Sequence, residues 1–282
     1  MTYNLPDRKN SIIVFDLETI PETSLAKELC EISDNEISNM SLNELREEMR
    51  QYHIEKHNNE FLRQPFHRIV CISFLKIDIL DELDEFGKKQ FFIKELNSYS
   101  SFNCSEEEVV KKFWHLLKEN KPQIVSFNGK MFDINVLKCK ALKYNIDCGW
   151  YFNLGGKFEC YDYPYSNSHY DLLYKYGSYT LHEMCISLNI PCKLGVDGSR
   201  VADYFDEKKY KEIREYCETD VLATFLVFLR MMIVEGEISK KEYNSCITQL
   251  ENLLINQQKD KQGIKEFLQE WHRLNPNGIT IK

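Results

Sequence analysis

Four carboxylates and one tyrosine in this chain have types and spacings that could hold divalent cations. They lie in three separated segments, VFDLETIPE at 14–22, SFNGKMFDINVL at 126–137 and IREYCETDVLATF at 213–225. The five residues are Asp16, Glu18, Asp133, Tyr216 and Asp220. Hard divalent cations prefer oxygen ligands, so these carboxylates, once brought together by the fold, would suit Mg²⁺ or Mn²⁺.

Each segment also predicts the element that carries it. The apolar run SIIVFD at 11–16 predicts a buried strand, and residues two apart on a strand share a face, so Asp16 and Glu18 should project together from its end. Asp133 should lie in the first turn of a helix, where an acid also complements the helix dipole. Tyr216 and Asp220 are four apart on a long apolar helix and should share a face. A strand that simply ends in polar residues, or a surface aspartate beside a core tyrosine, would explain each segment taken alone.

Taken together, the three segments resemble the Exo I, Exo II and Exo III motifs of DEDDy-type 3′–5′ exonucleases. The blocks HYDLL at 169–173, CKLGVDGSRVADYF at 192–205 and YCETDVL at 216–222 are similar to predicted exonucleases related to the family-B DNA polymerase exonuclease domain. The resemblance covers roughly residues 11–235. It implies an α/β fold with a ribonuclease-H-like mixed sheet flanked by helices.

The resemblance also implies an activity, the removal of nucleoside 5′-monophosphates from single-stranded 3′ ends with two Mg²⁺ or Mn²⁺ ions. Asp16 would contact both ions, Glu18 and Asp220 would complete one site, and Asp133 would serve the other through water. Because free tyrosine titrates near pKa ~10, Tyr216 is expected to orient the attacking water and not to act as a base.

Four further residues are expected to contact substrate, namely Thr19, Asn128, Phe132 and Arg200. DNA is the expected substrate, but an enzyme that trims RNA 3′ ends would use the same chemistry, and we name no residue that reads the 2′-hydroxyl. A partner subunit that binds 3′ ends without turnover is a third alternative. His169 could help shape the site.

The bulk composition is consistent with a nuclease that grips a few nucleotides. The chain has 282 residues, 43% of them hydrophobic, and a formal net charge of −8, which argues against a broad electrostatic grip on a duplex. Ten cysteines without a CxxC pair favour reduced thiols. The polar start MTYNLPDRKN and the lack of long apolar runs predict a cytoplasmic protein without membrane spans, with DNA repair as the expected setting.

The chain divides into a few expected regions. These are an N-terminal tail at 1–10, an exonuclease domain at 11–235 and a C-terminal helical extension at 236–282. A helical insertion at 22–66 follows the first strand, and we assign it no function from the sequence. Further strands are expected at 68–76, 89–95 and 123–127, and helices at 105–119, 131–144 and 208–234.

Overall fold

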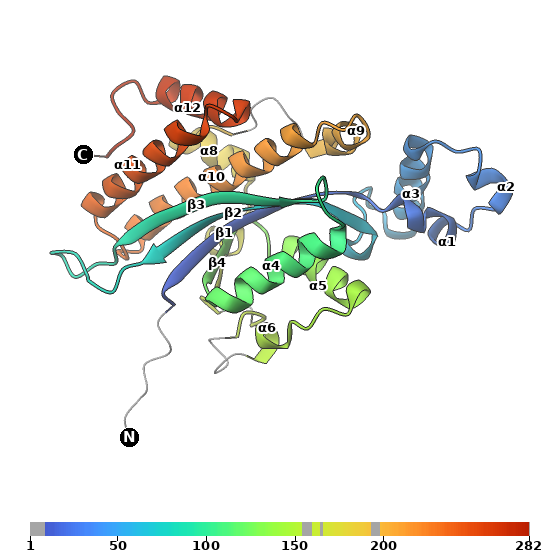
Figure 1. The fold of residues 1–282 in the computed structure, drawn as a ribbon, viewed down its shortest axis with the longest axis horizontal. Helices are drawn as coiled ribbons and strands as arrows, with labels where there is room; N and C mark the ends of the chain where they lie inside the picture. Colours follow the sequence, from blue (N-terminus) through green and yellow to red (C-terminus); the bar gives the residue numbers. More distant parts are fainter. Residues whose placement is uncertain (1–8, 154–159, 164–165, 193–197, 282) are drawn as a thin grey trace.

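A mixed sheet forms the centre of the protein. The computed structural model describes residues 9–153, 160–163, 166–192 and 198–281. Within them, five strands lie in the order β3-β2-β1-β4-β5 (Figure 1). β1 pairs antiparallel with β2 and parallel with β4, β2 pairs antiparallel with β3, and β4 pairs parallel with β5. The bounds are β1 Ser11–Pro21, β2 His67–Ile79, β3 Phe91–Ser100, β4 Gln123–Ser126 and β5 His169–Asp171.

Helices cover both faces of this sheet, which confirms the predicted fold class (Figure 1). One face carries α8 Leu181–Leu188, α10 Tyr210–Val234, α11 Lys240–Gln257 and α12 Gln262–Leu274. The other carries α4 Glu106–Asn120, α5 Asp133–Tyr144 and α6 Gly149–Asn153. The shorter elements are α7 Leu172–Tyr176, α9 Val201–Asp206 and the 3-10 turns η1 Thr23–Leu25, η2 Gln64–Phe66 and η3 Gly198–Arg200.

The side chains of β1 alternate between these two layers. Ile12 and Val14 belong to the core under α10, whereas Ile13 and Phe15 belong to the core under α4 and α5. Because side chains alternate along a strand, Asp16 and Glu18 lie on the same face of β1 as Ile12 and Val14, which is the face that α10 covers.

The segment between β1 and β2 forms a small helical unit at one end of the sheet (Figure 1). It contains α1 Ala26–Cys30, α2 Asp34–Ile37 and α3 Leu42–His57. Its own apolar cluster consists of Ala26, Leu45, Met49 and Leu62. The two ends of the segment meet, because the backbone N–H of Glu22 donates to the carbonyl of Phe66 at 2.8 Å.

Local signals for helix starts are confirmed. Ser41, Ser105 and Thr180 each accept a hydrogen bond from the backbone N–H three residues later, and a glutamate at that position bonds back to the cap. These capping boxes begin α3, α4 and α8. Among the described residues, no helix is both long and apolar enough to cross a bilayer.

The pair Ile20-Pro21 is expected to end the first strand, because proline removes a backbone donor, and β1 does extend to Pro21. β2 pairs with β1 from Ser11 to Pro21. Asp16 and Glu18 consequently lie inside the strand and not at its end. Residues 1–8 of the expected tail, and 193–197 within one block of the resemblance, lie outside the described residues.

Candidate active site

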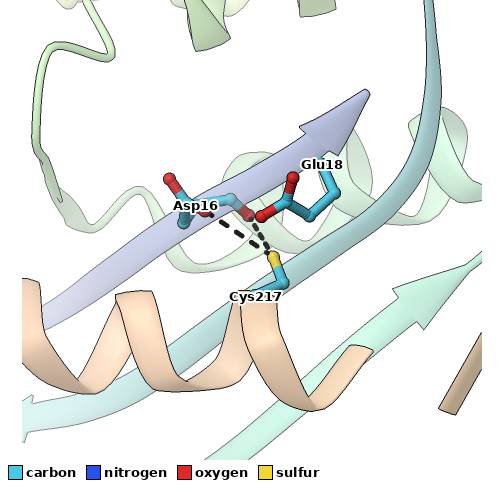
Figure 2. Close-up of side chains that lie close together, drawn as sticks. All are labelled: Asp16, Glu18 and Cys217. Carbon is cyan, nitrogen blue, oxygen red and sulfur yellow. Dashed lines mark hydrogen bonds between the residues drawn. The ribbon is translucent and has the colours of Figure 1, made fainter. Parts of the chain in front are cut away.

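The first two carboxylates lie on a part of β1 that β4 leaves unpaired. β4 pairs with β1 only from Ile12 to Val14. The register with β2 shifts between Glu18 and Thr19, an irregularity that bends a strand and re-aims its side chains. Figure 2 shows the carboxylates of Asp16 and Glu18 beside Cys217 of α10.

Helix α10 brings the third segment against this strand. The Cys217 thiol lies 3.4 Å from the backbone oxygen of Asp16 and 3.8 Å from its carboxylate (Figure 2). Tyr216 is buried, and its hydroxyl donates a hydrogen bond to Asp220. Burial raises the pKa of Tyr216, and the nearby carboxylates of Asp220, Glu18 and Asp16 raise it further. Tyr216 therefore stays protonated at neutral pH, so its hydroxyl can donate a hydrogen bond and is not available as a phenolate base.

Asp133 reaches the same place from the opposite face of the sheet. It is the first residue of α5, is 5% exposed, and accepts a hydrogen bond from the backbone of Leu17. Burial raises its pKa to about 7, and the charge of Asp171 adds to this shift. The structure thus brings all five residues of the three segments together.

The turn before α5 depends on tight backbone packing. Asn128 has a φ of 63°, in the left-handed region that asparagine tolerates. A side chain at Gly129 would place a Cβ 2.3 Å from the hydroxyl of Ser126. Asp171 fixes the turn by accepting hydrogen bonds from the backbone N–H groups of Asn128 at 3.1 Å and Lys130 at 2.8 Å. This carboxylate holds the loop that delivers Asp133.

The electrostatics of the cluster favour a bound cation. Burial raises the pKa of Asp16 well above its usual value, and Asp133 and Asp220 raise it further. Burial likewise raises the pKa of Glu18, followed by the charges of Asp16 and Asp220. A cation that replaced the lost hydration would relieve both effects.

The donor atoms fit a hard cation better than a soft one. One ligand atom each of Asp16, Glu18 and Cys217 lies within 4.8 Å of the others. The thiolate is the ligating form of cysteine, but burial raises the pKa of Cys217 well above its usual value. The protonated thiol of Cys217 is therefore a hydrogen-bond donor that supports Asp16, and the carboxylate oxygens are the ligands available to Mg²⁺ or Mn²⁺.

Thr19 is held in place by a histidine that sequence reasoning missed. The Nε2 of His67 lies 2.9 Å from the carbonyl of Leu62, which can only accept, so this nitrogen carries the proton. Burial lowers the pKa of His67 and keeps it neutral. Its Nδ1 then accepts from the hydroxyl of Thr19 at 2.9 Å. The hydroxyl of Thr19 is consequently held by His67.

Phe132 belongs to an aromatic group that was also missed. Its ring centre lies 5.0 Å from that of His67 and 5.3 Å from that of Phe61. Phe61 comes from the segment between β1 and β2 and is 57% exposed. The amide of Gln64 reaches the carbonyl of Met131 at 3.3 Å. The helical insertion thus contacts the loop that carries Phe132 and Asp133.

The contacts of Arg200 and His169 are with residues outside the carboxylate cluster. The guanidinium of Arg200 is exposed and lies 5.1 Å from the centre of the Tyr204 ring. His169 is buried, and its Nε2 lies 2.7 Å from the hydroxyl of Ser126. Burial lowers the pKa of His169 well below its usual value, so it is a neutral support of β4.

Comparison with known proteins covers the second and third of the three segments. Residues 59–271 match the model of a family described as predicted 3′–5′ exonucleases related to the exonuclease domain of PolB. The chain belongs to this family. A DNA polymerase of Methanocaldococcus jannaschii is 30% identical over 161 residues, which cover 51% of this chain and 10% of that protein. The chain therefore spans about a tenth of that polymerase's length.

The family match confirms the resemblance seen in the sequence. It contains Asp133, Tyr216 and Asp220, whereas Asp16 and Glu18 precede its first residue. Membership of these predicted exonucleases thus rests on the second and third segments. The first segment joins them through the geometry of β1 and α10.

Proposed function

We propose that this protein is a metal-dependent 3′–5′ exonuclease of the DEDDy type. It hydrolyses phosphodiester bonds at single-stranded 3′ ends, with DNA favoured, and releases nucleoside 5′-monophosphates. The observation that carries this function is the convergence of four carboxylates with a hydrogen-bonded tyrosine from three distant segments.

The four carboxylates would hold two Mg²⁺ or Mn²⁺ ions. The charges of Asp133 and Asp220 both act on Asp16, and the charge of Asp16 acts on Glu18, so Asp16 would contact both ions. Such ions supply activation of the attacking water and stabilisation of the leaving 3′-oxygen.

The remaining residues position the reactants. Tyr216 stays protonated and directs its hydroxyl into the carboxylate group, where it would orient the attacking water by a hydrogen bond. The backbone at Thr19 would meet the terminal sugar, and the ring of Phe132 would pack against a base. Asn128 fixes the turn beside them. Arg200 is exposed to solvent and would contact a phosphate of the strand at the point where the strand leaves the site.

The decisive experiment compares 5′-labelled single-stranded DNA, duplex DNA and single-stranded RNA of one sequence. Each is incubated with Mg²⁺, Mn²⁺ or EDTA, with the Asp16→Asn variant as control. We expect stepwise shortening from the 3′ end of single-stranded DNA, release of 5′-monophosphates, and no cleavage in EDTA. Faster shortening of RNA would reassign the substrate, and binding without cleavage in either metal would indicate a non-catalytic 3′-end-binding subunit.

A further inference from the structure

A hollow of about 360 Å³ lies on the side of α10 that faces away from Tyr216 and Asp220. Its walls are the end of β3, the chain that follows it and the first turns of α10. The residues that matter here are Ser100, Phe102, Lys112, Tyr210, Lys211 and Arg214. Tyr216 and Arg214 lie on different sides of the same helix, because they are two residues apart. The hollow is therefore separate from the carboxylate site.

An exposed aromatic pair forms one wall of this hollow. Phe102 is 60% exposed, and its ring stacks on Tyr210 with centres 4.8 Å apart and planes 29° apart. Tyr210 in turn packs edge-on against Phe205 at 5.3 Å. One face of the Phe102 ring is thus held by Tyr210. Its other face can stack on a flat ligand.

Three cations surround the same platform in a chain whose net charge is −8. Arg214 lies 3.8 Å from Glu218, but Glu218 is already bound by Lys261 at 2.8 Å and by the hydroxyl of Ser98 at 2.8 Å. The side chain of Arg214 is 35% exposed and lines the hollow, so its guanidinium is accessible to a ligand there.

The lysines extend this positive charge beyond the hollow. Lys211 lies 3.7 Å from Glu215, which is already engaged by the backbone N–H of Gly263 at 2.6 Å. Lys211 also lines an adjoining open hollow of about 560 Å³ together with Lys259 and Lys265. Positive charge thus continues from the aromatic pair along α10 to the junction of α11 and α12.

The hollow lies within a short reach of the carboxylates. Cys71 of β2 pairs with Glu18 on one side and with Ser100 on the other. Neighbouring strands are about 4.8 Å apart, so Ser100 is level with Glu18 at a distance of roughly 10 Å. Only the first turns of α10 separate the two places.

We infer that this hollow is a second binding site for single-stranded nucleic acid, which receives the 5′ continuation of the strand whose 3′ end lies at the carboxylates. One base stacks on Phe102, and the flanking phosphates contact Lys112, Lys211 and Arg214. Stacking on an aromatic ring beside cations is how proteins hold single strands without reading sequence. The inference rests on the proposed function for the direction of the strand, but binding can be measured without cleavage.

The test uses the full chain carrying Asp16→Asn, in Ca²⁺, with fluorescent oligothymidylates of 2 and 16 nucleotides. Phe102→Ala should weaken binding of the 16-mer about 5- to 150-fold, the usual range for one lost base stack. Binding of the 2-mer should stay unchanged, because it is too short to reach the hollow from the carboxylates. Phe102→Trp should restore the affinity for the 16-mer.

A charge variant gives an independent readout. Lys112→Ala with Lys211→Ala should make the salt dependence less steep by about 1.4 in log Kd against log salt, since each lost contact to a single strand removes about 0.7. The matched controls lie at the opposite end of the β2–β3 hairpin, Phe86→Ala for the ring and Lys240→Ala with Lys241→Ala for the charges.

Thermal melting first establishes that each variant is folded. Losses for the 16-mer no larger than in the controls would overturn the inference, as would equal losses for both lengths. Preferential binding of duplex DNA would also overturn it. Failure of the wild-type chain to cleave, with the length-dependent binding intact, would count against the exonuclease proposal alone.

Discussion

The hydroxyl of Tyr216 is a donor inside a group of acceptors. Because burial and three carboxylates raise its pKa, it cannot take a proton from water. We predict that Tyr216→Phe lowers kcat by about 10- to 100-fold, the low end of the range for acid–base and positioning groups. Metal affinity and melting temperature should stay close to wild type, because the ring still packs on α10. Wild-type rates would show that the hydroxyl has no role, and lost metal affinity would show that it is a ligand.

Substitution of Asp16 should cause the most complete loss of cleavage. Asp16→Asn keeps an oxygen that can accept from the Cys217 thiol but removes the charge that two cations would share. We predict that cleavage falls below about a hundredth of wild type, because even residues that only support metal ligands cost 10- to 100-fold. In EDTA the variant should melt at a higher temperature than wild type, because one repelling carboxylate is gone. Residual activity above that level would exclude Asp16 as a shared ligand.

Residue types and local spacing were enough to select five residues that the structure brings together, but not the residues that support them. Cys217 meets Asp16 across 201 positions of sequence, and His67 meets Thr19 across 48. A cysteine in an apolar helix and a histidine before a strand carry no signal of such contacts. The exposure of Phe61 likewise became meaningful only when the fold placed its ring beside Phe132.

At the scale of elements, the insertion between β1 and β2 can be removed cleanly. Its ends meet at the Glu22–Phe66 hydrogen bond, and its helices share a small core of their own. We predict that replacing 24–60 with a short Gly/Ser linker gives a folded protein that still cleaves in a metal-dependent way. Its KM should rise, because Phe61 loses the helices that hold it near Phe132. Loss of all cleavage by a folded deletion variant would show that the segment takes part in the chemistry.

A single substitution at Phe61 tests the role of its ring apart from that of the rest of this segment. Phe61→Ala should raise KM by about 5- to 150-fold if the ring stacks on a base, with little change in kcat. Phe86→Ala removes a ring of similar exposure at a distant turn and should change neither constant. An unchanged KM for Phe61→Ala would leave this aromatic group without a substrate role.

Helix starts were predictable from sequence because a capping box is made within four residues. The end of β1 at Pro21 was also predictable, because proline removes a ladder donor. The register shift between Glu18 and Thr19 was not predictable, since it depends on the pairing with β2. The orientation of the first two carboxylates is thus a product of the sheet and not of the local sequence.

For the whole molecule, net charge was a poor guide to local charge. The chain is acidic, but part of that charge is concentrated in the carboxylate cluster, and cations line the hollow beside α10. The distribution follows from which faces of α10 meet the sheet, and that packing could not be assigned from composition.

Stability of the whole chain should therefore depend on metal in a pH-dependent way. The pKa of Asp133 rises from 3.8 to about 7 on folding, so between these values the native state holds a proton that the unfolded chain has lost. This contribution to stability disappears as the pH rises through about 7, and bound cations should then replace it. We predict that the melting temperature in Mg²⁺ exceeds that in EDTA, and that the gap widens from pH 6 to pH 8.

The buried, neutral His169 destabilises the protein below about pH 6.5 in both conditions, so its effect cancels from the difference between the two melting temperatures. Asp133→Asn should make the gap smaller and less dependent on pH, and the raised pKa values of Asp16 and Glu18 account for the dependence that remains. Equal melting temperatures with and without millimolar Mg²⁺ at pH 8 would contradict a preformed cation site.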